Sequence, residues 1–222
     1  MLKFFEDLKL DIKQKEFFDK NIYTLVKSAL SIKGVRTLTQ DEFFSVWSLI
    51  KKNKPRVFLE LGGQHGHSGI VFANAVKSYG GTFITVELGD DVTNKYPIES
   101  VGTLQFLPDD DPNIVKIWGD CCKLLPRILD KYKVDMVFHD ADHTYESVEG
   151  CVKTILDYNP KITQICHDCK TGMWQPEKLT KYGYICAERP VFDKYFMNNP
   201  DYYYHVIEDG YGAGFAIPVE QL

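Results

Sequence analysis

The chain has 222 residues, of which 44% are hydrophobic and 26% charged, a composition typical of one globular domain and unlike that of a disordered segment. Its 26 Lys and Arg against 31 Asp and Glu give a formal charge of −5, without the basic excess of a nucleic-acid-binding domain. No stretch reaches the roughly 20 apolar residues of a membrane span. Acidic residues stand near the N-terminus, where a signal peptide needs an apolar run. We therefore expect a cytoplasmic protein that acts on small molecules, with no nucleic acid and no membrane as partner.

Six cysteines are spread through the second half of the chain: Cys121, Cys122, Cys151, Cys166, Cys169 and Cys186. An even number is compatible with disulfides, but a chain of this length without an export signal is expected to keep them reduced. Cys166 and Cys169 have the CxxC spacing of zinc ligands. A zinc ribbon needs a second such pair, which the sequence lacks, so we do not expect one here.

The first 55 residues carry the periodicity of helices. Apolar residues recur there at three- and four-residue spacing, which predicts one apolar stripe on a helix: Phe17, Phe18, Ile22, Leu25, Val26, Ala29 and Leu30. A second helix is expected to begin at Thr39, which forms a capping-box pattern with Glu42, and to stop at Pro55. We predict a helical extension over residues 1–55 that covers one edge of the main domain. The alternative is that it forms a lid or a homo-oligomer interface.

From residue 56 onward, apolar runs alternate with helical segments. Strands are expected over 57–61, 82–87, 113–118, 134–139 and 162–166, helices over 68–77, 123–131, 145–158 and 189–197, and a final antiparallel pair over 202–207 and 212–217. This order predicts an α/β fold in residues 56–222, a Rossmann-like, doubly wound, mostly parallel seven-stranded sheet with an antiparallel C-terminal strand. Ligands bind beyond the carboxyl ends of such strands, and polar residues or glycines stand at four of those ends.

The end of the first strand carries an ExGxxxGxS pattern, formed by Glu60, Gly62, Gly66 and Ser68. It lacks the GxGxxG spacing of a dinucleotide-binding fingerprint. The pattern resembles the first motif of the class I S-adenosylmethionine-dependent methyltransferases. That resemblance implies that these four residues bind the cofactor, S-adenosyl-L-methionine. The alternative is an ordinary strand-to-helix connection.

Two further strand ends carry acidic residues that the same resemblance places at the cofactor. A carboxylate at Glu87 can accept hydrogen bonds from two ribose hydroxyls, which is the role that the family gives to this position. Asp120 and Cys121 follow the third strand, where these methyltransferases often have Gly-Asp-Ser beside the adenine amino group; Cys121 departs from the serine. Asp120 could equally cap the next helix.

The most specific segment covers residues 135–148. It resembles the D-x-x-F-I-D-G-D-H-S-Y-E-x-V stretch of the branch that includes macrocin-type O-methyltransferases and cephalosporin-hydroxylase-like proteins, methyltransferase domain family 24. His139 and Ala141 depart from that stretch. The fifth strand then ends in His167 and Asp168, where the branch has His-Asp, Glu-Asp or Asp-Asp. The resemblance covers residues 56 to about 218.

The resemblance also implies a metal site, because several relatives bind Mg²⁺ at positions that match Asp140, His167 and Asp168. A divalent cation there would orient two substrate hydroxyls and lower the pKa of the one to be methylated. The alternative is that Asp140 contacts the methionine part of the cofactor and the other two residues close the pocket. His143 is the candidate general base, since imidazole titrates near neutral pH; otherwise it caps the helix that begins near Tyr145.

These features predict methyl transfer to a small-molecule acceptor, at a sugar-like or phenolic hydroxyl, with His143 and Asp140 as catalytic residues. Two other functions stay open: an iron-dependent oxidative enzyme with a 2-His-1-carboxylate site, and a binding protein without catalysis. Phe72 and Trp118 are expected in the core. Trp174 lies in a loop after the fifth strand that we expect to set acceptor choice.

Overall fold

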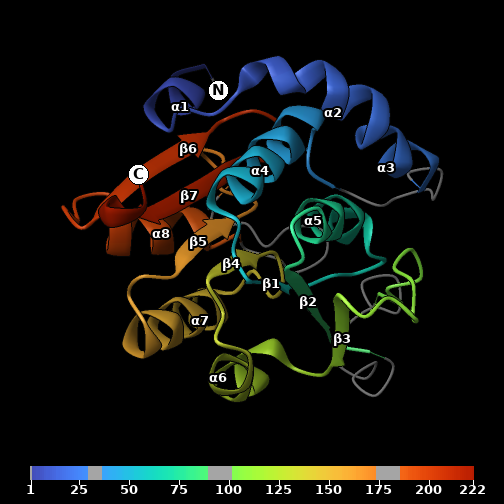
Figure 1. Ribbon diagram of the computed structural model, residues 1–222. Coiled ribbons are helices and arrows are strands. Elements are labelled where there is room, and N and C mark those ends of the chain that lie inside the picture. Colours follow the sequence, from blue (N-terminus) through green and yellow to red (C-terminus); the bar gives the residue numbers. More distant parts are fainter. Residues whose placement is uncertain (1, 30–36, 90–101, 174–185) are drawn as a thin grey trace.

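A computed structural model describes residues 2–29, 37–89, 102–173 and 186–222 (Figure 1). The strands are β1 (Val57–Leu61), β2 (Thr82–Glu87), β3 (Ile114–Trp118), β4 (Met136–His139), β5 (Thr163–Cys166), β6 (Tyr202–Ile207) and β7 (Ala213–Pro218). The α-helices are α1 (Leu2–Asp7), α2 (Lys15–Asn21), α3 (Tyr23–Ala29), α4 (Gln40–Asn53), α5 (His67–Lys77), α6 (Cys121–Tyr132), α7 (Tyr145–Tyr158) and α8 (Glu188–Phe196). Trp174 lies outside the described residues.

The seven strands form one sheet in the order β3-β2-β1-β4-β5-β7-β6. Strands β1 to β5 are parallel to their neighbours, and β7 runs antiparallel to both β5 and β6. The predicted fold is thereby confirmed. The strand order reverses between β1 and β4, so a ligand crevice is expected at their carboxyl ends.

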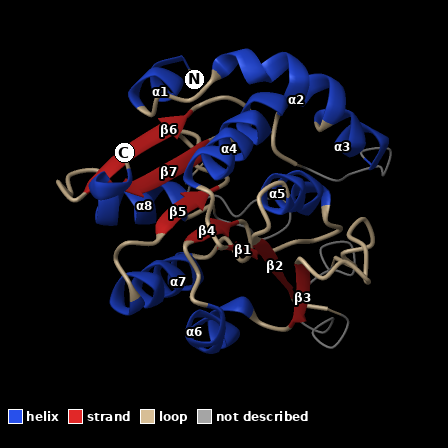
Figure 2. Cartoon of the chain, in the orientation of Figure 1, coloured by secondary structure: helices blue, strands red, loops and turns tan. Residues whose placement is uncertain are grey.

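Helices cover both faces of this sheet (Figure 2). Phe58 belongs to the core on the side of α4 and α5, whereas the next residue, Leu59, belongs to the core on the side of α6 and α7. This alternation follows from the two-residue period of a strand. Because every central strand is buried on both faces, the strands read in the sequence as continuous apolar runs.

The apolar stripe expected between Phe17 and Leu30 is only partly correct. The helix is divided, with α2 ending at Asn21 and α3 beginning at Tyr23. Phe18, Ile22 and Val26 lie four residues apart and are buried, while Phe17 is 56% and Leu25 is 47% exposed. Of the predicted stripe, these three residues face the core; Leu30 lies outside the described part of the chain.

Helix α4 begins with the predicted capping box. Thr39 Oγ1 accepts a hydrogen bond from the Glu42 amide at 3.3 Å, and Glu42 Oε2 accepts one from the Thr39 amide at 2.6 Å. The rings of Phe43 on α4 and Phe72 on α5 lie 6.3 Å apart, so the N-terminal helices share one core with the sheet. A domain boundary near residue 55 stays a prediction. None of the described helices is long and apolar enough to cross a bilayer.

The two aromatic residues expected in the core differ. Phe72 is fully buried, as predicted, but Trp118 is 49% exposed, so the core prediction is wrong for Trp118. The reason is its position: β3 is an edge strand, and Trp118 is its last residue, opposite Glu87 in the register of β2 and β3.

Candidate functional site

The Glu60 side chain lies inside the fold, beneath the glycine-rich turn. It is fully buried, and its two oxygens accept hydrogen bonds from Ser68 Oγ at 2.5 Å and from Thr85 Oγ1 at 2.7 Å. Burial raises the pKa of Glu60 to about 8, so the carboxyl is mostly neutral at pH 7. Glu60 and Ser68 thus connect β1 to the beginning of α5 inside the fold. Their predicted contact with the cofactor stays a prediction.

The turn after β1 depends on glycine. Gly62 and Gly66 both have φ of +90°, a conformation that disfavours residues with a Cβ. A Cβ on Gly62 would also lie 2.1 Å from the backbone carbonyl oxygen of Asp140. The turn thus brings the backbone of β1 directly against the segment that leaves β4.

Glu87 stands at the end of β2, beside that turn. Its Oε2 accepts a hydrogen bond from the Gln64 amide at 2.6 Å, and its Oε1 accepts one from the Gly102 amide at 3.3 Å. Burial raises the pKa of Glu87. Backbone amides, that of Leu88 among them, therefore hold this carboxylate at the end of β2.

Asp120 caps α6, the alternative that the sequence left open. Its Oδ1 accepts hydrogen bonds from the amides of Cys122 at 3.0 Å and Lys123 at 3.4 Å, and its Oδ2 pairs with the Lys123 ammonium at 2.9 Å. Cys121 is the first residue of the helix. A contact of Asp120 or Cys121 with the cofactor stays a prediction.

The structure brings the three predicted metal ligands together at the ends of β4 and β5. Asp140, His167 and Asp168 each offer one ligand atom, and these atoms lie within 4.8 Å of one another. His167 Nδ1 is 3.4 Å from Asp140 Oδ1 and 3.8 Å from Asp168 Oδ1. Asp168 has φ of 56°, a backbone conformation that is uncommon outside glycine and is often found at functional positions.

Two buried acids that the sequence analysis did not assign to the site complete it. Glu188, the first residue of α8, places Oε1 2.5 Å from His143 Nδ1, and Asp168 Oδ2 lies 3.5 Å from the same nitrogen. On the other side, Glu42 of α4 places Oε2 3.9 Å from His167 Nε2. The capping-box pattern identified Glu42 only as a cap, and no sequence pattern marked Glu188.

The acids determine the charge of both imidazoles. Burial acts to lower the pKa of His143, but Glu188, Asp168 and Asp140 outweigh it and raise the pKa to about 10. In the same way, Asp140 and its acidic neighbours raise the pKa of His167 to about 9 against the effect of burial. Both imidazoles therefore hold a second proton at neutral pH in this arrangement.

Helix α7 is capped by Thr144, whose Oγ1 accepts a hydrogen bond from the Ser147 amide at 3.4 Å. Asp142 supports the same turn by accepting hydrogen bonds from the Thr144 amide and from Ser147 Oγ. His143 instead points to Glu188 and Asp168. The cap that the sequence offered as an alternative role for His143 is therefore made by its neighbours.

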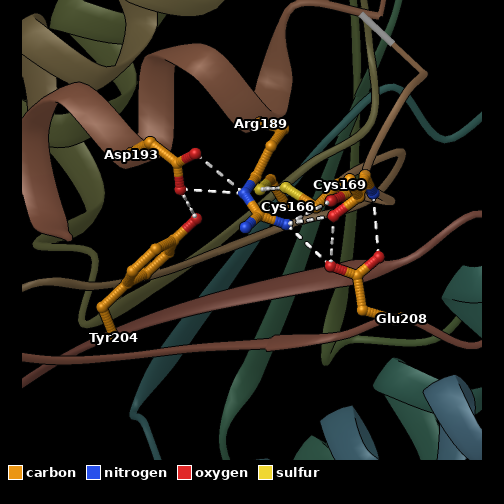
Figure 3. Close-up of polar contacts among 7 residues, drawn as sticks. Cys166, Cys169, Arg189, Asp193, Tyr204 and Glu208 are labelled. Atoms are coloured by element: carbon orange, nitrogen blue, oxygen red, sulfur yellow. Dashed lines mark hydrogen bonds and ion pairs between the residues drawn. The ribbon is translucent and has the colours of Figure 1, made fainter.

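Helix α8 holds the turn that follows β5 (Figure 3). Arg189 Nε donates to both carboxylate oxygens of Asp193, at 2.8 and 2.9 Å, while Nη1 donates to the Cys169 carbonyl at 3.2 Å and to Glu208 Oε1 at 2.9 Å. Tyr204 on β6 donates its hydroxyl to the same Asp193. Arg189 thereby holds the carbonyl of Cys169, the residue that follows His167 and Asp168.

His139 takes no part in these clusters. Its Nε2 lies 3.1 Å from Gln164 Oε1, and burial lowers the pKa of His139 to about 4. Among the described residues, two groups that could hold a metal contain Asp168. One combines it with Asp140 and His167, and the other with His143 and Glu188, so each group has one histidine. A 2-His-1-carboxylate site needs two imidazoles in one group.

A sequence-family model for a methyltransferase domain matches residues 59–169, half of the chain. The chain belongs to this methyltransferase family. No curated protein matches the sequence significantly. The matched range contains the glycine-rich turn, Glu87 and the three predicted metal ligands, but neither Glu42 nor Glu188.

Solved structures share the fold of this methyltransferase at low sequence identity. An O-methyltransferase from Bacillus cereus in complex with SAH matches with a TM-score of 0.61 and 16% identity, over 98% of this chain and 96% of that chain. The O-methyltransferase TomG from Streptomyces achromogenes, in complex with SAM, gives 0.61 and 17%, over 97% and 94%. The SAH-bound methyltransferase PaMTH1 from Podospora anserina gives 0.62 and 16%, over 93% and 94%.

Proposed function

We propose that this methyltransferase transfers a methyl group from S-adenosylmethionine to a hydroxyl of a small sugar-like or phenolic acceptor, with a divalent cation at Asp140, His167 and Asp168. One observation carries the proposal: a glycine-rich turn with an acidic strand end beside it lies next to a buried carboxylate–imidazole cluster, at the point where the strand order reverses. The names of the similar solved structures, two of them O-methyltransferases with bound SAM or SAH, support it.

The residues on the cofactor side fit S-adenosylmethionine, which would supply a methyl group activated on a sulfonium. The close approach of Gly62 to the Asp140 backbone leaves the turn without side-chain atoms at that contact. Glu87 is a carboxylate at a strand end, a group that accepts hydrogen bonds from ribose hydroxyls. The exposed ring of Trp118, in register with Glu87, offers an apolar face for the adenine.

The residues on the other side fit a hard divalent cation. Four carboxylates, from Glu42, Asp140, Asp168 and Glu188, surround the imidazoles of His143 and His167, so the cluster has an excess of negative charge even when both imidazoles are protonated. His167 Nδ1 is the ring nitrogen that faces both Asp140 and Asp168. When bound, the cation would lower the pKa of the acceptor hydroxyl.

The protein itself mainly positions the reactants, because methyl transfer is an in-line displacement. Asp140 and Asp168 would orient the acceptor hydroxyls at the ends of β4 and β5. The general-base role of His143 stays a prediction, and its raised pKa weighs against it unless added positive charge in the cluster favours loss of the proton.

The experiment that tests the proposal measures S-adenosylhomocysteine formation by the full chain with a panel of catechols, phenols and sugars. Exhaustive EDTA treatment should abolish transfer, and Mg²⁺ or Mn²⁺ should restore it. Asp168→Asn should be inactive with or without added metal, while its affinity for S-adenosylmethionine stays within a few-fold of wild type. Asp142→Asn, which changes an acid two residues after Asp140 but outside the cluster, should respond to metal as wild type does.

Three results would contradict the proposal. Full transfer after EDTA treatment, with no metal found by elemental analysis, would remove the cation. Oxygen-dependent turnover with Fe²⁺ and without S-adenosylhomocysteine would favour the oxidative enzyme instead. Tight cofactor binding without product over the whole panel would favour a binding protein.

A further inference from the structure

Three thiols from two helices converge on one point outside the carboxylate–imidazole cluster. Cys121 and Cys122 open α6, and Cys151 lies in the middle of α7. Their three Sγ atoms lie within 4.8 Å of one another, and those of Cys122 and Cys151 are 3.3 Å apart. We call this group the thiol trio. It is brought together by the packing of α6 on α7 and not by proximity in the sequence.

The spacing of the thiol trio suits a tetrahedral thiolate site. Zinc–sulfur bonds of about 2.3 Å in a tetrahedron place two sulfurs about 3.8 Å apart. That separation lies between the 3.3 Å of the closest pair and the 4.8 Å limit of the group. Small side-chain adjustments would therefore bring all three sulfurs to one ion.

The surroundings of the thiol trio favour a thiolate and leave an open position. Cys121 and Cys122 are the first two residues of α6, and the N-terminus of a helix favours a thiolate. A small cavity is lined by the three cysteines and also by residues that include Ala141, Asp142 and Glu188. It offers room for one solvent molecule beside the sulfurs.

We propose that the thiol trio binds one zinc ion, through the thiolates of Cys121, Cys122 and Cys151, with a solvent molecule from the cavity as fourth ligand. Binding releases the remaining thiol protons to the buffer and involves no oxidation or reduction. The ion joins the beginning of α6 to the middle of α7. The three cysteines form a group distinct from Asp140, His167 and Asp168, with Glu188 bordering the cavity that the cysteines line. The inference does not rest on the proposed function.

The test uses the full chain, reduced with a phosphine, freed of metal with EDTA and kept anaerobic. Cd²⁺ serves as the probe, because cadmium–thiolate bonds absorb in the ultraviolet. We expect the absorption to saturate at one Cd²⁺ for each chain, with release of protons, and Zn²⁺ to displace the Cd²⁺. Cys151→Ala should weaken Cd²⁺ binding at least ~100-fold, since even partners beyond the ligands change metal affinity 10–100-fold.

The matched control removes the other close pair of thiols. Cys166 and Cys169 are fully buried, with Sγ atoms 2.7 Å apart, and the Cys166→Ala, Cys169→Ala double variant should keep the absorption and its stoichiometry. Circular dichroism checks that each variant is folded, and Cys122→Ser replaces Cys151→Ala if the latter is not. The proposal is overturned if wild type shows no saturable absorption, if only the double variant loses it, or if the thiol-trio variants keep it.

Discussion

The carboxyl groups at the ends of β1 and β2 have different partners from those at the ends of β4 and β5. At β1 and β2, Glu60 and Glu87 accept hydrogen bonds from neutral groups, two hydroxyls and two backbone amides. At β4 and β5, the carboxylates of Asp140 and Asp168 face imidazoles instead. Burial raises the pKa of Glu60 and Glu87, whereas the charge of His167, with that of His143, outweighs burial and lowers the pKa of Asp140.

The difference shows how one edge can serve two reactants. Neutral donors hold the β1–β2 side in a fixed shape, which suits recognition of a ribose by hydrogen bonds. Paired charges on the β4–β5 side rearrange when a cation or an acceptor hydroxyl enters, because each added charge changes the balance of the others. Four changes test this contrast, and they are given from the largest expected effect to the smallest.

Gly62→Val should have the largest effect, because it adds a side chain where the turn after β1 contacts the backbone of Asp140. The new Cβ would overlap the Asp140 carbonyl and would force φ of +90° on a β-branched residue. We expect loss of measurable S-adenosylmethionine binding and a much lower melting temperature. Gly150→Ala, where a Cβ meets open space in α7, is the control and should bind as wild type does. A folded Gly62→Val that binds normally would show that the turn has been misinterpreted.

Glu188→Gln tests whether paired charge holds the β4–β5 side. It leaves the buried His143 without its nearest carboxylate, and breaking a buried ion pair typically lowers the free energy of unfolding by about 3–5 kcal/mol. Glu208→Gln removes a half-exposed carboxylate from Arg189 and should cost less than about 1 kcal/mol. Urea unfolding at pH 7 measures both. Equal losses would mean that the cluster is not held by charge.

Glu87→Ala should act on the cofactor more than on the fold. Losing charged hydrogen bonds to two hydroxyls costs about 1.5–3 kcal/mol, which is roughly a tenfold to hundredfold loss of affinity. Calorimetry with S-adenosylmethionine measures the loss, and Glu87→Gln, which retains one acceptor oxygen, should be intermediate. Unchanged affinity in a folded Glu87→Ala protein would remove Glu87 from the binding site.

Glu60→Gln should change the pH dependence of stability on the neutral side. The folded pKa of Glu60 is about 8, above the ordinary value of 4.5, so its contribution to stability is complete below pH 4.5 and is lost as pH rises through 8. The loss from one pH unit to the next is about 1.4 kcal/mol, which is the smallest single step among the four changes. The variant, which stays neutral, should become steadily more stable than wild type between pH 5 and 8 in urea unfolding. Parallel pH curves would contradict a buried neutral carboxyl.

The fold was predictable because its signals are local. Apolar strand runs separated by amphipathic helices gave all seven strands, and Thr39 and Glu42 marked the start of α4. Trp118 was placed wrongly because exposure at an edge strand depends on the strand order, which a local pattern does not contain. The division between α2 and α3 was missed because the apolar periodicity continues through Ile22, whereas the helix is interrupted there.

The site was predictable only where its residues adjoin strand ends. Asp140, His167 and Asp168 follow directly from β4 and β5, so strand order alone brings them together. Glu188 contacts His143 from 45 residues away, and no spacing rule connects the two. The same holds for the thiol trio, in which two helices contribute residues from separate segments.

Glu42 connects an early segment of the chain to a late one. Its Oε1 accepts a hydrogen bond from the amide of Gly212 at 2.8 Å, across 170 residues of sequence, while its Oε2 stands beside His167. Contacts of such separation close a long loop and tend to form late in folding. During synthesis, the ribosome releases the strands of the β1–β5 sheet well before residue 212. We therefore expect Glu42 to take its position beside His167 only after β7 has joined β5, and a nascent chain that stops short of β7 to carry the motifs without this contact.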